Sequence, residues 1–151
     1  MNSLLQLLLQ LESHISNSEK SKLNVSNSTI GWHLDHSLMV INGVIEQLEI
    51  SNPSNFHPKW TFSKFMVLMT GNIPRGKAKA PKVVMPIHSA SQAELFLKIE
   101  LAKKNNLKLA TFPKNLFFKH PFFLDLNVKQ TERFLVIHTK HHLKIIKDIL
   151  K

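Results

Sequence analysis

Residues 127–151, NVKQTERFLVIHTKHHLKIIKDILK, form the stretch that decides the fold. Asn127 and Gln130 have the spacing of a helix N-cap and its partner, so we predict a helix that begins here and runs almost to Lys151. Spacings of four and three residues, the period of one helix face, then follow along the stretch. The residues on this face are Thr131, Leu135, His138, His142, Ile145 and Ile149. The face is typical of a core-facing helix, and its two middle positions are histidines.

The same period predicts three more long helices and one short helix. Ser91 and Glu94 have capping-box spacing ahead of an apolar run, so one of these helices should start there. Pro53 should end another, because the residue before a proline avoids the helical region. The four expected helices span residues 4–15, residues 29–50, residues 60–69, and residues 92 to about 103–106.

The connections between these helices are long and show no strand pattern. No alternation of period two and no hairpin dipeptide is present, and prolines interrupt the aromatic segment 107–127. The phenylalanines of that segment are expected to fill the core. We therefore predict an all-α protein, a four-helix bundle with long crossover loops and a short extra helix. A chain of 151 residues fits a single domain spanning residues 1–151.

The charge of the chain is strongly positive. Twenty Lys and Arg residues face ten Asp and Glu residues, which gives a net charge of +10. Such a chain favours anionic partners. Only Arg75 and Arg133 are arginines, however, and arginine is the residue that reads base edges, so nucleic acid is an unlikely partner. The lysine-rich run GKAKAPK, residues 76–82, is expected to be a solvated loop.

Other composition features exclude several classes of protein. The absence of cysteine excludes disulfides, thiolate zinc sites and cysteine nucleophiles, and it is compatible with the cytoplasmic location that we expect. No apolar run reaches the roughly 18 residues of a membrane span, so no membrane partner is expected. Apolar helix faces left over by the bundle favour a homodimer.

The paired histidines of the last helix point to a metal site. Side chains four residues apart are neighbours on a helix, so His138 and His142 can converge on one ion. A third ligand is expected from the helix over residues 29–50, which offers His33 and His36. On a helical wheel His33 lies closer to the main apolar stripe, whereas His36 lies on a second face beside the small Gly43. The residues alone leave both candidates open.

Two common kinds of metalloenzyme are excluded. Thr139 and Lys140 follow His138 where an HExxH protease has its glutamate, and the Glu-x-x-His pairs of di-iron bundles are missing. No acidic residue stands out as a general base, and Asp35, Glu46 and Glu94 are only weak candidates. His57 and His120 each precede a proline and are expected to form loops rather than to bind metal.

Three segments resemble the DinB-like (YfiT-like) metalloenzyme superfamily. They are TIGWHLDH at residues 29–36, HPFF at residues 120–123 and HTKHHLK at residues 138–144. The last two are similar to the C-terminal signature of one uncharacterised branch, although Leu124 replaces the glycine and Ile145 the glutamine that this branch usually has. The resemblance implies a four-helix bundle with a divalent metal ion bound by His36, His138 and His142.

The expected function follows from these observations. The leading hypothesis is a divalent-metal protein with a three-histidine site. Bound zinc or nickel would keep one coordination position open for water and would lower the pKa of that water. Hydrolysis of a small-molecule substrate would use that position, and the resemblance also implies thiol-dependent transfer. The alternative is a non-catalytic basic helical module that binds an anionic partner such as nucleic acid.

Overall fold

The computed structural model describes residues 3–76 and 82–151, and most of them are helical. Five α-helices and a two-stranded sheet follow one another with three short 3-10 helices between them. The α-helices are α1 (Ser3–Ser13), α2 (Ile30–Glu49), α3 (Phe62–Thr70), α4 (Gln92–Leu109) and α5 (Val128–Leu150). The strands are β1 (Phe117–His120) and β2 (Leu124–Asn127), and the 3-10 helices are η1 (Ile15–Asn17), η2 (Pro53–Asn55) and η3 (Lys82–Val84).

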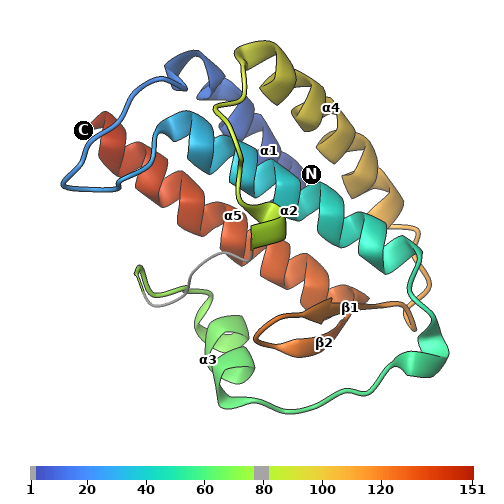
Figure 1. The fold of residues 1–151 in the computed structure, drawn as a ribbon. Coiled ribbons are helices and arrows are strands. Elements are labelled where there is room, and N and C mark those ends of the chain that lie inside the picture. Colours follow the sequence, from blue (N-terminus) through green and yellow to red (C-terminus); the bar gives the residue numbers. More distant parts are fainter. Residues whose placement is uncertain (1–2, 77–81) are drawn as a thin grey trace.

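The two longest helices, α2 and α5, lie side by side in opposite directions at the centre of the molecule (Figure 1). Helices α1 and α4 pack against this pair, and α3 lies apart from them next to the first half of α5. The segment that includes η3 passes over α2 on its way to α4. The mostly helical character agrees with the prediction from sequence.

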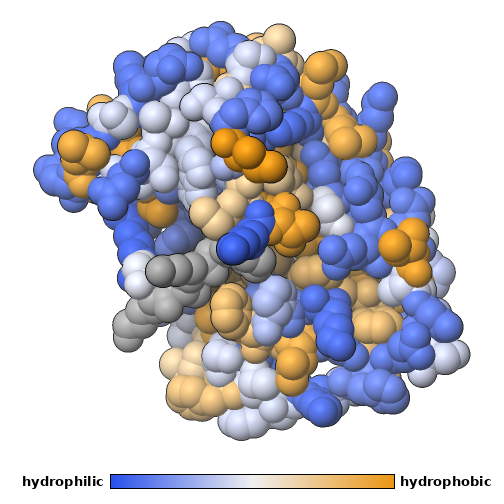
Figure 2. Space-filling model, in the orientation of Figure 1, coloured by the Kyte–Doolittle hydropathy of each residue, from blue (hydrophilic) through white to orange (hydrophobic). Residues whose placement is uncertain are grey.

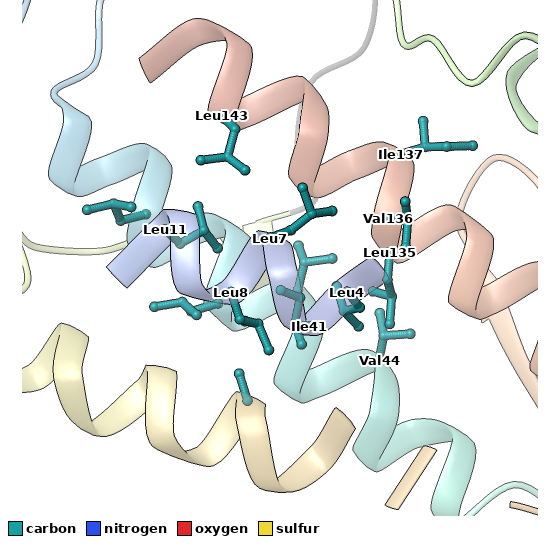
Figure 3. Packing of buried hydrophobic residues seen from close by; sticks show 14 of the residues in the cluster. Leu4, Leu7, Leu8, Leu11, Ile41, Val44, Leu135, Val136, Ile137 and Leu143 are labelled. Atoms are coloured by element: carbon teal, nitrogen blue, oxygen red, sulfur yellow. The ribbon is translucent and has the colours of Figure 1, made fainter. Parts of the chain in front are cut away.

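A single apolar core joins the four long helices. The side chains of Leu4, Leu8 and Leu11 in α1 are completely buried, as are those of Ile41 in α2 and Leu135 in α5. Figure 3 shows these side chains directed into the space between the helices. Burial of each such side chain stabilises the fold by about 1.5–3 kcal/mol, so helix packing and not local propensity holds α2 and α5 together.

The predicted helix starts are confirmed at α4 and α5. The Ser91 hydroxyl accepts a hydrogen bond from the Glu94 backbone N–H, and the Glu94 carboxylate accepts one from the Ser91 N–H. Asn127 and Gln130 form the same reciprocal pair at α5. These caps satisfy N–H groups that the first helical turn leaves without a partner.

Helix α4 continues further than its polar sequence predicts. The expected fraying near residues 103–106 is wrong, since the helix ends at Leu109. Asn105 is buried there, and its side-chain amide donates a 3.0 Å hydrogen bond to the Asn42 side-chain oxygen. Asn42 in turn donates to the Lys98 carbonyl oxygen at 3.1 Å. A buried amide network therefore joins α2 and α4 here, where the prediction considered apolar contacts only.

The aromatic segment before α5 forms a β-hairpin that the sequence analysis did not predict. Strands β1 and β2 are antiparallel, with Phe118 opposite Leu126 and His120 opposite Leu124. Leu124 has φ of 57°, the left-handed conformation that favours glycine.

Exchange of Leu124 for glycine or alanine measures this backbone strain. Both exchanges remove the side chain, but only glycine adopts a positive φ without steric cost. Leu124→Gly should therefore be more stable than Leu124→Ala by about 1 kcal/mol in denaturant unfolding. At Lys119, an exposed position of β1, the order should reverse and alanine should be the more stable. Equal stability of the two Leu124 variants would contradict the strain.

Candidate metal centre

Three histidines from the two central helices meet in one cluster. His36 comes from α2, and His138 and His142 come from successive turns of α5. One ring nitrogen of each lies within 4.8 Å of one ring nitrogen of the other two. The Nε2 atoms of His36 and His138 are 3.2 Å apart, and the ring centroids of His138 and His142 are 4.6 Å apart. The antiparallel packing of α2 and α5 thus brings together residues about a hundred positions apart in the sequence.

The orientation of His36 is fixed by the chain segment that crosses α2. Its Nδ1–H donates a 2.7 Å hydrogen bond to the backbone carbonyl oxygen of Val84 in η3. A neutral imidazole has one N–H, so Nε2 keeps a lone pair on the side of the other two rings, where it accepts a 3.2 Å hydrogen bond from Nε2–H of His138. A backbone carbonyl on the far nitrogen is the usual outer partner of a metal-binding histidine.

His142 is held from behind by a second histidine of α2. Its Nδ1 lies 3.0 Å from Nδ1 of His33, whose Nε2 lies 2.9 Å from the Ser26 hydroxyl oxygen. When His142 donates to His33 and His33 donates to Ser26, all three groups are satisfied with both rings neutral. Nε2 of His142 then has a lone pair, as Nε2 of His36 does.

His138 differs from its two neighbours because its outer nitrogen has no partner. The Nδ1 atom is buried and makes no hydrogen bond to any of the described residues. A buried polar atom without a partner costs free energy, and such atoms in folded proteins often mark functional sites. The ring is held by packing instead, between Phe134 and His142.

Burial keeps the imidazoles of the cluster neutral. It lowers the pKa of His138 and His142 well below the usual value and also lowers the pKa of His36. Burial, and then the neighbouring His36, lowers the pKa of His33 to about 4. Neutral imidazole is the form that binds a metal ion, so the donors need no deprotonation near pH 7.

The two candidates that the sequence left open differ in their position relative to His138 and His142. His36, not His33, completes the cluster with His138 and His142. Both ring nitrogens of His33 are occupied, one by His142 and the other by Ser26. No neighbour approaches the small Gly43 closely, because a Cβ atom placed there would meet nothing within 4 Å.

The remaining candidates lie outside the cluster. Asp35 is buried in α2 and forms a 2.5 Å ion pair with Lys98, so its carboxylate is already engaged. His57 lies in a loop and donates its backbone N–H to the Asp125 carboxylate at 2.7 Å. His141 is half-buried beside the cluster. The middle of the lysine-rich run, residues 77–81, lies outside the described residues.

Three parts of the site were missed in the sequence analysis. The Val84 carbonyl belongs to the short 3-10 helix η3 and the Ser26 hydroxyl to the connection between η1 and α2, where no periodic pattern predicts a contact. The Trp32 ring stacks on His36 with centroids 5.0 Å apart and an interplanar angle of 16°. The motif TIGWHLDH could have predicted the contact of Trp32 with His36. Trp32 and His33 precede His36 by four and three residues, and such spacings place side chains on one helix face.

Comparison of the chain with protein-family models, with curated proteins and with solved structures finds no match. No helix of the described residues combines the length and apolar character that crossing a membrane requires.

Acidification should destabilise the metal-free protein. Burial lowers the pKa of His120, a histidine of the hairpin, to about 4. The unfolded chain therefore binds more protons than the native state between about pH 6.5 and 4, and stability falls as the pH drops. Each histidine of this kind contributes at most about 1.4 kcal/mol per pH unit.

Urea unfolding at pH 7, 6 and 5 can separate the contribution of His120 to the pH dependence of stability from that of the other buried histidines. His120→Asn should make the loss of stability with falling pH less steep than in the wild type. The matched control is His88→Asn, which makes the same exchange at an exposed histidine outside the hairpin. A slope that does not differ between His120→Asn and the wild type would contradict the assignment.

Proposed function

We propose that this protein binds one divalent metal ion through the Nε2 atoms of His36, His138 and His142. The observation that supports the proposal is the convergence of three neutral imidazoles in a buried cluster. Val84 and His33 engage the outer nitrogens of His36 and His142, so the Nε2 lone pairs of these two rings are available as ligands for an ion. Neutral imidazole is the commonest side-chain ligand of metal ions in proteins, and three imidazoles are a known ligand set for zinc.

The donor set fits a borderline divalent ion. Imidazole nitrogen suits zinc and nickel, and three protein ligands leave a position open for substrate. When bound, the ion supplies Lewis-acid activation at that open position. The chain's own residues hold the site: Val84 and His33 orient two of the rings, and Trp32 covers one face of His36.

We further propose that the protein is a metalloenzyme of the DinB-like type, a hydrolase or a thiol-dependent transferase acting on a small molecule. The sequence motifs at residues 29–36 and 138–144 support this assignment, and so does the mostly helical fold. Asp35 is paired with Lys98, so we do not assign it the role of general base. A homodimer and a cytoplasmic location remain predictions from sequence.

Metal analysis of purified variants tests the site. Wild-type protein dialysed against zinc or nickel at pH 7.5 should retain about one equivalent of metal, because three ligands converge. His36→Ala, His138→Ala and His142→Ala should each lose tight binding. His141→Ala and His57→Ala, which change histidines outside the cluster, should retain the ion. Circular dichroism should show the same helix content in all five variants.

Two results would contradict the proposal. Retention of metal by all three cluster variants would mean that the ion binds elsewhere. Absence of metal from the wild type, together with salt-dependent binding of nucleic acid, would favour the non-catalytic basic module.

His33 gives an independent test of the outer hydrogen bonds. Loss of an outer partner typically lowers metal affinity about 10- to 100-fold without abolishing binding. His33→Ala should therefore weaken zinc affinity within that range in a competition titration with a chelator. Complete loss of metal in His33→Ala, with retention in His36→Ala, would show that His33 is the true third ligand.

A further inference from the structure

A cavity opens directly beside the histidine cluster. It has a volume of about 300 Å³ and lies between α2, α5, the η3 segment and the β-hairpin. His36, His138 and His142 form part of its wall. A volume of this size is at the lower end of ligand pockets, so it suits a small molecule and not a polymer. Figure 2 shows hydrophobic side chains gathered in the middle of one face of the molecule and hydrophilic ones around its upper edge.

The rest of the cavity wall is mostly apolar. Val40 and Val44 contribute aliphatic surface from successive turns of α2, and both are 5% exposed. Phe118, Phe123 and Phe134 contribute aromatic rings from the hairpin and α5. None of the described residues that line the cavity is acidic, so the cavity offers no partner for a cationic group. Its surface favours a ligand with a compact apolar body.

His120 adds one polar group to this apolar wall. Its Nδ1 accepts hydrogen bonds from the backbone N–H groups of Phe122 and Phe123 at 3.0 and 3.1 Å. The proton of the neutral ring must therefore be on Nε2. No hydrogen bond joins Nε2 to another of the described residues, and the ring, which is 9% exposed, lines the cavity. His120 thus presents a neutral N–H donor, and burial, which lowers its pKa to about 4, keeps it neutral.

The donor and the histidine cluster belong to the same cavity. The Phe134 ring lies between them, with its centroid 4.6 Å from that of His120 and 5.6 Å from that of His138. A ligand that contacts His120 is therefore separated from the cluster by about the size of the Phe134 ring. A ligand bound against His120 withdraws this N–H from water, so a ligand without an acceptor leaves it unpaired and binds less tightly.

We infer that this cavity binds a small molecule without a cationic group, which has an aromatic or branched apolar body and a carbonyl-type acceptor that takes a hydrogen bond from Nε2–H of His120. The inference names the class of molecule on which the proposed metal centre would act, and it rests on the proposed function for that role only. Binding itself needs the cavity wall and His120, so it can be measured without metal.

Acetophenone and its isostere α-methylstyrene separate the requirement for an apolar body from the requirement for a hydrogen-bond acceptor. The two probes share shape and apolar body, but only acetophenone has a carbonyl acceptor. Titration of metal-free protein is followed through the indole N–H signal of Trp32, which lines the cavity. The chain has two tryptophans, so a Trp60→Phe background leaves Trp32 as the single indole signal.

We expect acetophenone to bind about three- to tenfold more tightly than α-methylstyrene, the ratio that one net hydrogen bond provides. Acetamide, which has the acceptor without the apolar body, should not bind measurably. His120→Asn keeps an acceptor for the two backbone N–H groups but removes the Nε2 donor. It should lower acetophenone affinity to that of α-methylstyrene, whereas His88→Asn should change neither.

Val44→Phe gives a second variant that leaves the hairpin unchanged. The larger side chain fills the cavity from α2, so both aromatic probes should lose binding. Failure of acetophenone to shift the Trp32 signal would overturn the inference, and so would an unchanged ratio of the two affinities in His120→Asn. Probe binding in a protein that takes up no metal would overturn the proposed metal function and leave this inference standing.

Discussion

The burial of three imidazoles between two antiparallel helices is the constraint on which the rest of the structure depends. Polar rings withdrawn from water cost free energy unless their nitrogens find partners. The chain supplies the Val84 carbonyl for His36 and the pair His33–Ser26 for His142. Of the outer nitrogens of the three rings, only Nδ1 of His138 has no hydrogen-bond partner among the described residues. The inward nitrogens face one another, an arrangement that becomes favourable when an ion lies between them.

The irregular segments act on this cluster from two sides. The η3 segment crosses α2 and brings the Val84 carbonyl to His36, and this contact links the long connection between α3 and α4 to the site. The β-hairpin brings His120 and its neighbouring aromatic rings to the cavity wall. The helices therefore place the candidate ligands, whereas the connections determine their tautomers and the shape of the space beside them.

Sequence patterns predicted the helical elements well and the connections poorly. The caps at Ser91 and Asn127 form between residues only three positions apart, so short sequence motifs predict them. The hairpin did not follow, because Leu124 occupies a left-handed turn position without a glycine to indicate it. His138 and His142 were found from helical spacing alone. The preference for His36 over His33 needed the resemblance, since the relative rotation of two packed helices is a tertiary property.

X-ray absorption spectroscopy of the zinc-loaded protein tests the central claim most directly. The account predicts scattering from three imidazole rings, with zinc–nitrogen distances of about 2.0–2.1 Å, and one further light atom in the remaining position. The imidazole scattering should fall by one ring in any variant of His36, His138 or His142 that still retains zinc. A spectrum with oxygen ligands alone, or with fewer than two imidazoles in the wild type, would contradict the three-histidine centre.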